Sequence, residues 1–134
     1  MVSHAGNEFV PSVLIVDSSE ETREVLETAL AQRGVRTLSA SRPAAGLALA
    51  EEHRPDVIVL DLEADSPSRA LAERFAEQTQ GRAASLVFLG SASRQLDCPS
   101  GEFVRKPYHY GPLISKIESL LAESRPLASV GNAA

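Results

Sequence analysis

Two short apolar runs that each end in an aspartate constrain the fold of this chain more than any other feature. One run, VLIV at residues 13–16, is followed by Asp17, and the other, VIVL at residues 57–60, is followed by Asp61. Strands that are apolar on both faces are typical of a parallel sheet covered by helices. Because an ionised carboxylate is costly to bury, each aspartate is expected to mark the edge of the sheet, where open α/β sheets bind their ligands.

Helical patterns alternate with short apolar strands along the rest of the chain. Capping residues and apolar spacing predict further strands at residues 35–38, 85–89 and 102–105, and helices that begin at residues 18–21, run over 43–53 and 70–78, and include 113–121. Residues 92–101 are polar and contain Pro and Gly, so at most one helical turn is expected there. This order predicts an α/β protein of the flavodoxin-like (βα)5 class, with a doubly wound parallel five-stranded sheet in the order 2-1-3-4-5 and a shortened fourth helix.

In this topology the first and third strands flank the crevice in which a ligand binds. Asp17 and Asp61 end those two strands, so both carboxylates are expected in one crevice. Lys106 follows the fifth strand, which we expect beside the third, and its ammonium would reach the same place. Two carboxylates that repel each other favour a cation with hard oxygen ligands such as Mg²⁺, and a neighbouring lysine is suited to hold phosphoryl oxygens.

The bulk composition narrows the range of functions. A chain of 134 residues is long enough for one domain, which we place at residues 12–123, between a flexible N-terminal segment (1–11) and a disordered C-terminal tail (124–134). The net charge of -5 disfavours nucleic acid as a partner, and no run approaches the roughly 20 apolar residues of a membrane span. Cys98 is the single cysteine and cannot form an intramolecular disulfide, which fits a cytoplasmic location.

Three segments together resemble the receiver domains of two-component response regulators. VLIVDSSEETREVL resembles the first strand and helix of that family, GLALAEEHRPDVIVLDL the run into the phosphoacceptor, and FVRKPY the Lys-Pro segment. The resemblance extends over residues 13–121 and implies a function in bacterial phosphorelay signalling. Such a protein accepts a phosphoryl group from a histidine kinase or phosphotransfer protein and signals through contacts with a downstream protein, here unknown. It is not an enzyme beyond catalysing its own phosphoryl transfer and dephosphorylation.

The same resemblance assigns roles to individual residues. It implies that Asp61 is the phosphoacceptor, that Asp17, Asp61 and the backbone carbonyl of Glu63 bind Mg²⁺, that Lys106 pairs with the phosphoryl group, and that Ser91 and Phe103 are switch residues. It also implies a cis peptide bond between Lys106 and Pro107. The chemistry of such a site is nucleophilic attack by a carboxylate, with the charge neutralised by metal and lysine.

Two residues depart from the family pattern. Ser18 stands where the family usually has a second acid, so Mg²⁺ is expected to bind weakly. Gly90 stands where the family has a hydroxyl, and Ser91 follows one residue late, where a regular strand would point it to the opposite face. An alternative therefore stays open, a degenerate receiver that acts as a phosphorylation-independent interaction module. A flavodoxin-like enzyme or cofactor carrier is disfavoured because no glycine-rich phosphate cradle follows the first strand.

Overall fold

The protein folds around a parallel sheet of five strands. The computed structural model describes residues 10–62, 69–91, 93–94 and 101–124. Its elements, in chain order, are β1 (Ser12–Val16), α1 (Glu20–Ala31), β2 (Arg36–Ala40), α2 (Pro43–His53), β3 (Val57–Asp61), α3 (Arg69–Glu77), β4 (Ser85–Gly90), β5 (Glu102–Arg105) and α4 (Tyr110–Glu123). The strands pair in the order β2-β1-β3-β4-β5, and every pair is parallel. The predicted flavodoxin-like topology is confirmed.

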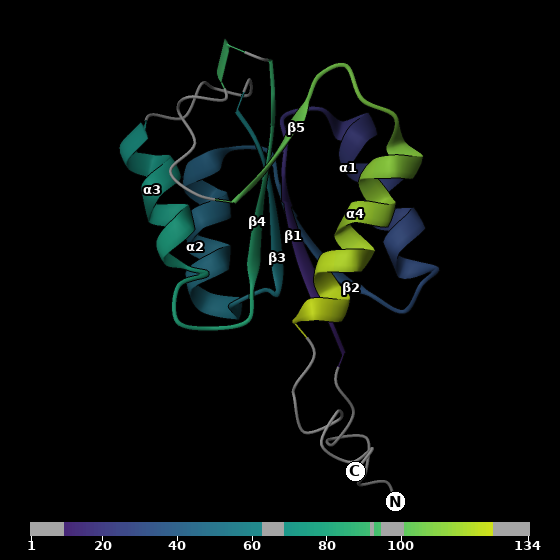
Figure 1. The fold of residues 1–134 in the computed structure, drawn as a ribbon, viewed down its shortest axis with the longest axis horizontal. Helices are drawn as coiled ribbons and strands as arrows, with labels where there is room; N and C mark the ends of the chain where they lie inside the picture. Colours follow the sequence, from purple (N-terminus) through teal and green to yellow (C-terminus); the bar gives the residue numbers. More distant parts are fainter. Residues whose placement is uncertain (1–9, 63–68, 92, 95–100, 125–134) are drawn as a thin grey trace, which may run out of the picture.

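Helices cover both faces of the sheet, α1 and α4 on one face and α2 and α3 on the other (Figure 1). Alternate residues of β1 pack against the helices on opposite faces of the sheet, because successive side chains of a strand point to opposite faces. Val13 and Ile15 join the cluster that contains residues of α1 and α4, whereas Leu14 and Val16 join the cluster that contains residues of α2 and α3. All four side chains are fully buried, at 0% exposure. The first apolar run is therefore a strand buried on both faces.

The surroundings of β5 differ in one respect from the prediction. β5 pairs with β4, with Phe103 opposite Phe88, so β4 separates it from β3. The expectation that the fifth strand lies beside the third was wrong, because the order 2-1-3-4-5 places the fifth strand at the outer edge. No α-helix occurs among residues 91, 93–94 and 101, the described part of the β4–β5 connection. Residues 95–100, which include Cys98, lie outside the described residues.

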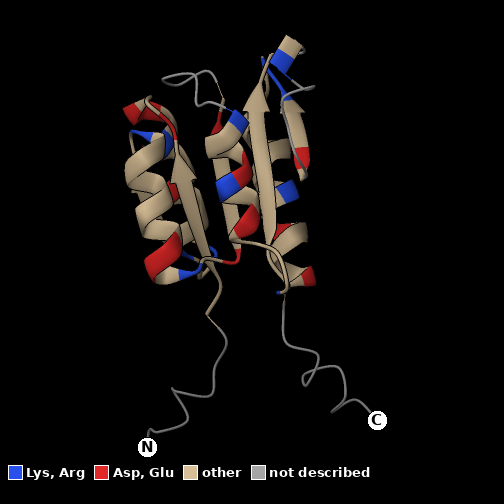
Figure 2. Ribbon diagram, turned by 90° about the vertical axis from the view of Figure 1, so that its left-hand side faces the viewer, with Lys and Arg blue, Asp and Glu red and all other residues tan. Residues whose placement is uncertain are grey.

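Basic and acidic residues are interspersed along the helices on the side of the molecule that includes α2 and α3 (Figure 2). Arg69 and Glu73 pair within α3 at 3.2 Å, and Arg74 of α3 pairs with Glu51 of α2 at 3.3 Å. These side chains are exposed, so each pair contributes little to stability. No helix in the described ranges has the length and apolar character needed to cross a membrane.

Helix α2 approaches the sheet closely at Gly46. A Cβ atom built at Gly46 would lie 2.5 Å from Cγ2 of Val16, the last residue of β1. Val16 is fully buried and its β-branched side chain has little rotamer freedom, so glycine is needed for this approach. Because Asp17 follows Val16, the same contact fixes the end of the strand that carries the first carboxylate.

Gly46→Ala is expected to lower the free energy of unfolding, measured by urea denaturation. The clash with Val16 should cost about 1–3 kcal/mol, while alanine gains about 1 kcal/mol in helix propensity, so we expect a net loss of about 1 kcal/mol. Gly111→Ala in α4 is the matched control, since nothing lies within 4 Å of a Cβ at Gly111, and it should lose no stability. Equal losses in both variants would contradict the close approach of α2 to β1.

Candidate functional site

Asp17 and Asp61 lie together at the carboxyl edge of the sheet. β1 and β3 are neighbours in register, with Val16 opposite Leu60, so the next residue on each chain segment is an aspartate. The two residues are 3% and 4% exposed. They line a cavity of about 670 Å³ whose other walls come from the start of α1 and from the connection between β5 and α4. The sheet order thus brings together two carboxylates that are far apart in the sequence.

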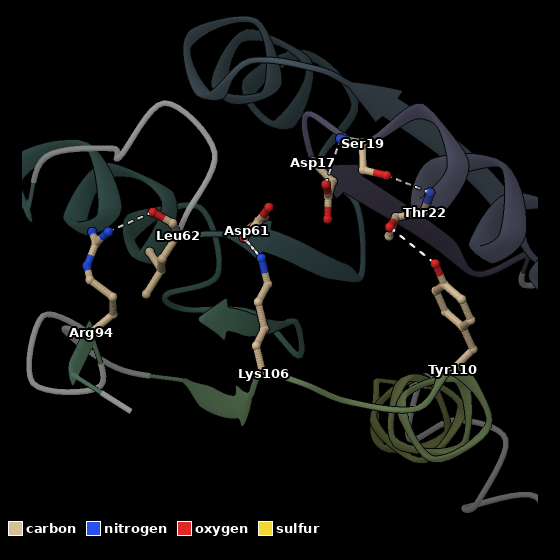
Figure 3. Close-up of polar contacts among 8 residues, drawn as sticks. All are labelled: Asp17, Ser19, Thr22, Asp61, Leu62, Arg94, Lys106 and Tyr110. Carbon is tan, nitrogen blue, oxygen red and sulfur yellow. Dashed lines mark hydrogen bonds and ion pairs between the residues drawn. The ribbon is translucent and has the colours of Figure 1, made fainter. Parts of the chain in front are cut away.

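Lys106 reaches this cavity from the far side of β4 (Figure 3). Its Nζ lies 2.6 Å from Oδ1 of Asp61, and its backbone N–H donates to the Gly90 carbonyl at 2.8 Å. The long lysine side chain therefore spans the end of the strand that separates β5 from β3. The side chain of Asp61 is 5% exposed and that of Lys106 is 31% exposed, so the pair is largely shielded from water. The Lys106–Pro107 peptide bond is cis, as the resemblance implies.

The Asp17 carboxylate is held by the start of α1. The Ser19 N–H donates to Oδ1 of Asp17 at 2.9 Å, and the Ser19 hydroxyl caps the helix by accepting the Thr22 N–H at 3.1 Å. Arg23 donates to the backbone carbonyl of Asp17 at 2.6 Å. Burial raises the pKa of Asp17 above its ordinary value, the Ser19 N–H partly opposes this, and the nearby Asp61 carboxylate raises the pKa further. The fold therefore holds a carboxylate where its charge is disfavoured, an arrangement that a bound cation relieves.

Two tyrosines, Tyr108 and Tyr110, line the same cavity. The Tyr110 hydroxyl lies 3.2 Å from Oγ1 of Thr22, which links α4 to α1 (Figure 3). The rings of Tyr108 and Tyr110 meet edge to face, with their centroids 5.9 Å apart. Burial raises the pKa of Tyr108 to about 12, and the Asp17 charge adds to the shift. Neither residue was predicted from the sequence. A signal was present, since the chain has two tyrosines and both closely follow Lys106.

Ser91 and Phe103 were predicted as switch residues. The hydroxyl of Ser91 is 3.0 Å from the hydroxyl of Ser93. Neither Ser91 nor Gly90 is among the described residues that line the cavity. Phe103 is partly buried and packs against the cluster shared with α2 and α3. The described lining of the cavity thus includes Asp17, Asp61 and Lys106 and neither of the two switch candidates.

The cavity provides two carboxylates, those of Asp17 and Asp61, as possible metal ligands. Ser18 lines the cavity with Asp17 and Asp61 and contributes no charge. Within the described ranges no group of three or more His, Cys, Asp or Glu side chains is placed to hold a metal. Glu63, whose carbonyl the resemblance implies as a ligand, lies outside the described residues. Mg²⁺ commonly binds through one or two carboxylates and keeps several waters, so Asp17 and Asp61 fit a hydrated ion.

Comparison with known proteins gives partial sequence matches. No protein-family model matches the chain. The KDP operon transcriptional regulatory protein KdpE of Escherichia coli is 29% identical over 116 residues, which cover 82% of this chain and 51% of KdpE. The chain thus spans about half the length of this curated relative. KdpE is named as a transcriptional regulator. This comparison therefore does not support the expectation that nucleic acid is excluded as a partner.

Solved structures show the same kind of fold. The receiver domain of the Francisella response regulator 1452 has a TM-score of 0.72 at 20% identity, over 86% of this chain and 99% of that domain. The chemotaxis response regulator CheY4 of Vibrio cholerae has a TM-score of 0.70 at 20% identity, over 84% of this chain and 99% of CheY4. At 20% sequence identity, structural similarity establishes the fold and not the function. The chain has the CheY-like fold of response-regulator receiver domains, and the resemblance inferred from its sequence is confirmed at this level.

Asp17→Asn is expected to stabilise the metal-free protein at neutral pH. The pKa of Asp17 is raised in the folded state. The free energy of unfolding therefore includes a full contribution from protonated Asp17 below about pH 4, and this contribution is lost as the pH rises through the folded-state pKa. Asparagine keeps an acceptor for the Ser19 N–H and does not ionise. The free energy of unfolding of Asp17→Asn should therefore exceed that of the wild type by an amount that grows as the pH rises through the folded-state pKa, as measured by urea denaturation with a chelator present.

Asp56→Asn is the matched control for this measurement. Asp56 accepts the Ser12 N–H at 2.9 Å, at the opposite end of the strands, and its replacement is not expected to increase stability. If Asp17→Asn were less stable than the wild type at every pH, the unfavourable burial of the Asp17 charge would be contradicted.

Proposed function

We propose that residues 12–123 form a response-regulator receiver domain in which Asp61 accepts a phosphoryl group from a histidine kinase or phosphotransfer protein. The observation that carries this proposal is the contact of Lys106 Nζ with Asp61 Oδ1 at 2.6 Å, in a cavity that Asp17 also lines. A carboxylate nucleophile with a cation already beside it suits phosphoryl transfer, where catalysis is mostly positioning and charge stabilisation. The receiver-domain fold supports the same proposal.

The proposed reaction is a displacement at phosphorus. An oxygen of the Asp61 carboxylate attacks the phosphorus of a phosphohistidine, and the phosphorus–nitrogen bond breaks. The imidazole nitrogen keeps the electron pair of that bond and takes up a proton, while the carboxylate becomes an aspartyl phosphate. The Lys106 ammonium, which contacts Asp61 before the reaction, would balance the negative charge of the incoming phosphoryl oxygens.

Asp17 and Asp61 would hold the Mg²⁺ that receiver domains generally bind at the phosphorylation site, with the Glu63 carbonyl as a further ligand. When bound, the ion supplies positive charge to the phosphoryl oxygens. Because Ser18 replaces an acid, the site has one negative charge fewer for the ion, and we propose weak binding. In the absence of the ion, Asp17 tolerates burial by holding its proton more tightly, consistent with its raised pKa.

The proposed partners follow from this chemistry. The phosphoryl group would come from a cytoplasmic kinase or phosphotransfer protein. Output would pass through contacts with a downstream protein, since the chain's own chemistry is limited to gaining and losing the phosphoryl group. The residues that contact such a partner would be those whose positions depend on whether Asp61 carries a phosphoryl group.

A degenerate receiver that works without phosphorylation is the second candidate. Ser18 weakens the metal site, and neither Gly90 nor Ser91 is among the described residues that line the cavity. In such a protein the pair between Lys106 and Asp61 would be a permanent structural link. The two candidates differ in whether Asp61 takes up a phosphoryl group.

Asp61→Asn is expected to abolish phosphorylation while the protein still folds. Wild-type protein incubated with acetyl phosphate and Mg²⁺ should gain one phosphoryl group, detected by intact mass and by retarded migration in a phosphate-binding gel. The amide lacks the nucleophilic oxygen, so the variant should gain none. Asp56→Asn serves as the control and should be phosphorylated normally. Equal phosphorylation of the Asp61 variant would remove this residue from its proposed role, and no phosphorylation of the wild type would favour the degenerate receiver.

Ser18→Asp is expected to tighten Mg²⁺ binding by about tenfold or more, because a further carboxylate a few ångströms from a dication contributes roughly 1–2 kcal/mol even in high dielectric. Tyrosine fluorescence can report the titration directly, since both tyrosines line the cavity and the chain has no tryptophan. Ser18→Asn is the matched control of similar size without the charge. A midpoint that is the same for all three proteins would show that Ser18 is not the cause of weak binding.

A further inference from the structure

Leu62, the residue after Asp61, is held by two hydrogen bonds from the β4 side of the site. Its N–H donates to the Leu89 carbonyl at 2.8 Å, and its carbonyl accepts a hydrogen bond from Nη1 of Arg94 at 2.8 Å (Figure 3). Leu62 is 1% exposed, so water has little access to it. The backbone next to the proposed acceptor therefore depends on β4 and on the turn after it for its hydrogen bonds.

Arg94 is itself held in the short turn that follows β4. Its N–H donates to the Ser91 carbonyl at 3.0 Å, and the hydroxyls of Ser91 and Ser93 are 3.0 Å apart. The Arg94 side chain is partly buried, and its bond to the Leu62 carbonyl is charge-assisted, a stronger type than a bond between neutral groups. This arginine is therefore a fixed link between the turn and the end of β3.

The end of β4 supports both charged groups of the site. The Gly90 carbonyl accepts the Lys106 N–H at 2.8 Å, while Arg94, on the turn that follows, holds Leu62 beside Asp61. Phosphorylation would convert the singly charged Asp61 carboxylate into an acyl phosphate that carries roughly two negative charges, a net gain of about one, which acts on the Arg94 guanidinium as well as on the Lys106 ammonium. The two states of Asp61 would thus differ in their interaction with the turn, as any conformational coupling requires.

We propose that Arg94 is a positioning residue that couples the state of Asp61 to the turn after β4. The proposal rests on the proposed function, because it concerns the response to a phosphoryl group. Gly90 has no hydroxyl to contact such a group, and the tether from Arg94 to the Leu62 carbonyl takes over the transmission of the signal. The surface that changes for a partner is then this turn, in a connection that has no α-helix among its described residues.

The test is a set of two-dimensional NMR spectra of amide and arginine Nε–H groups, recorded with Mg²⁺ before and after addition of beryllofluoride, which mimics an aspartyl phosphate. The wild type, Arg94→Gln, Arg94→Lys and Arg74→Gln are compared. Arg74 is the control, because it also forms a polar contact, with Glu51 at 3.3 Å, but on the exposed surface of α2 and α3.

In the wild type, beryllofluoride should shift the signals of Asp17 and Lys106 together with those of Ser91 and Ser93. In Arg94→Gln the first two should shift as before, while the shifts of Ser91 and Ser93 shrink by about twofold or more. Arg94→Lys should restore part of the response, since an ammonium can also donate to a carbonyl. Arg74→Gln should respond like the wild type, and all four proteins should be folded at the temperature of the spectra.

The failure of this proposal is distinguishable from failure of the proposed function. Unchanged shifts at Ser91 and Ser93 in Arg94→Gln, beside normal shifts at Asp17 and Lys106, would overturn the role of Arg94 and leave phosphorylation of Asp61 intact. Loss of every shift in that variant, with a lowered unfolding midpoint, would also overturn it, because Arg94 would then serve the fold alone. Absence of shifts in the wild type at saturating Mg²⁺ would overturn the proposed function itself.

Discussion

An ion pair that crosses the end of one strand joins the two halves of this site. Lys106, beyond the edge strand β5, contacts Asp61 at the end of β3, and the end of β4 lies between them. A fully parallel sheet makes the contact possible, because the carboxyl ends of all its strands meet at one edge. The Asp61 side chain is 5% exposed and that of Lys106 is 31% exposed, so the lysine charge compensates a carboxylate that is largely removed from water. The arrangement of β3, β4 and β5 and the proposed chemistry therefore depend on the same contact.

Stability and function make opposite demands at this edge. The three central strands, β1, β3 and β4, are mostly apolar and buried, and the helices pack over them on both faces, which stabilises the fold. Asp17 adds a carboxylate whose charge is disfavoured by burial and by Asp61. Proteins commonly tolerate such unfavourable charges where a site needs them. The raised pKa of Asp17 therefore supports the proposal that this position serves binding.

Most of the fold could be predicted because its signals are local and periodic. The apolar runs that end at Asp17 and Asp61 marked two strands, Pro43 marked the start of α2, and the apolar stripe between residues 113 and 121 marked α4. The strand order then placed both aspartates in one crevice without any knowledge of side-chain contacts. The site could be predicted to this extent because it lies at strand ends, which the topology determines.

Other parts of the site could not be predicted, because they depend on the paths of connections. The link between Thr22 and Tyr110 joins two helix starts, and the bond from Arg94 to the Leu62 carbonyl depends on the conformation of a turn. Neither contact produces a periodic pattern of residues in the sequence. The neighbour of β5 was predicted wrongly because reach was argued from strand adjacency, whereas a lysine side chain is long enough to cross a strand end.

The most direct test of the central claim is to locate the phosphoryl group chemically. Wild-type protein would be phosphorylated in the presence of Mg²⁺ and reduced with borohydride, which converts an aspartyl phosphate to homoserine, and then digested for peptide mass spectrometry. A receiver domain that uses this site should yield homoserine at residue 61 and at no other aspartate. Homoserine at a different position, or none despite saturating donor and Mg²⁺, would contradict the assignment of Asp61 as phosphoacceptor.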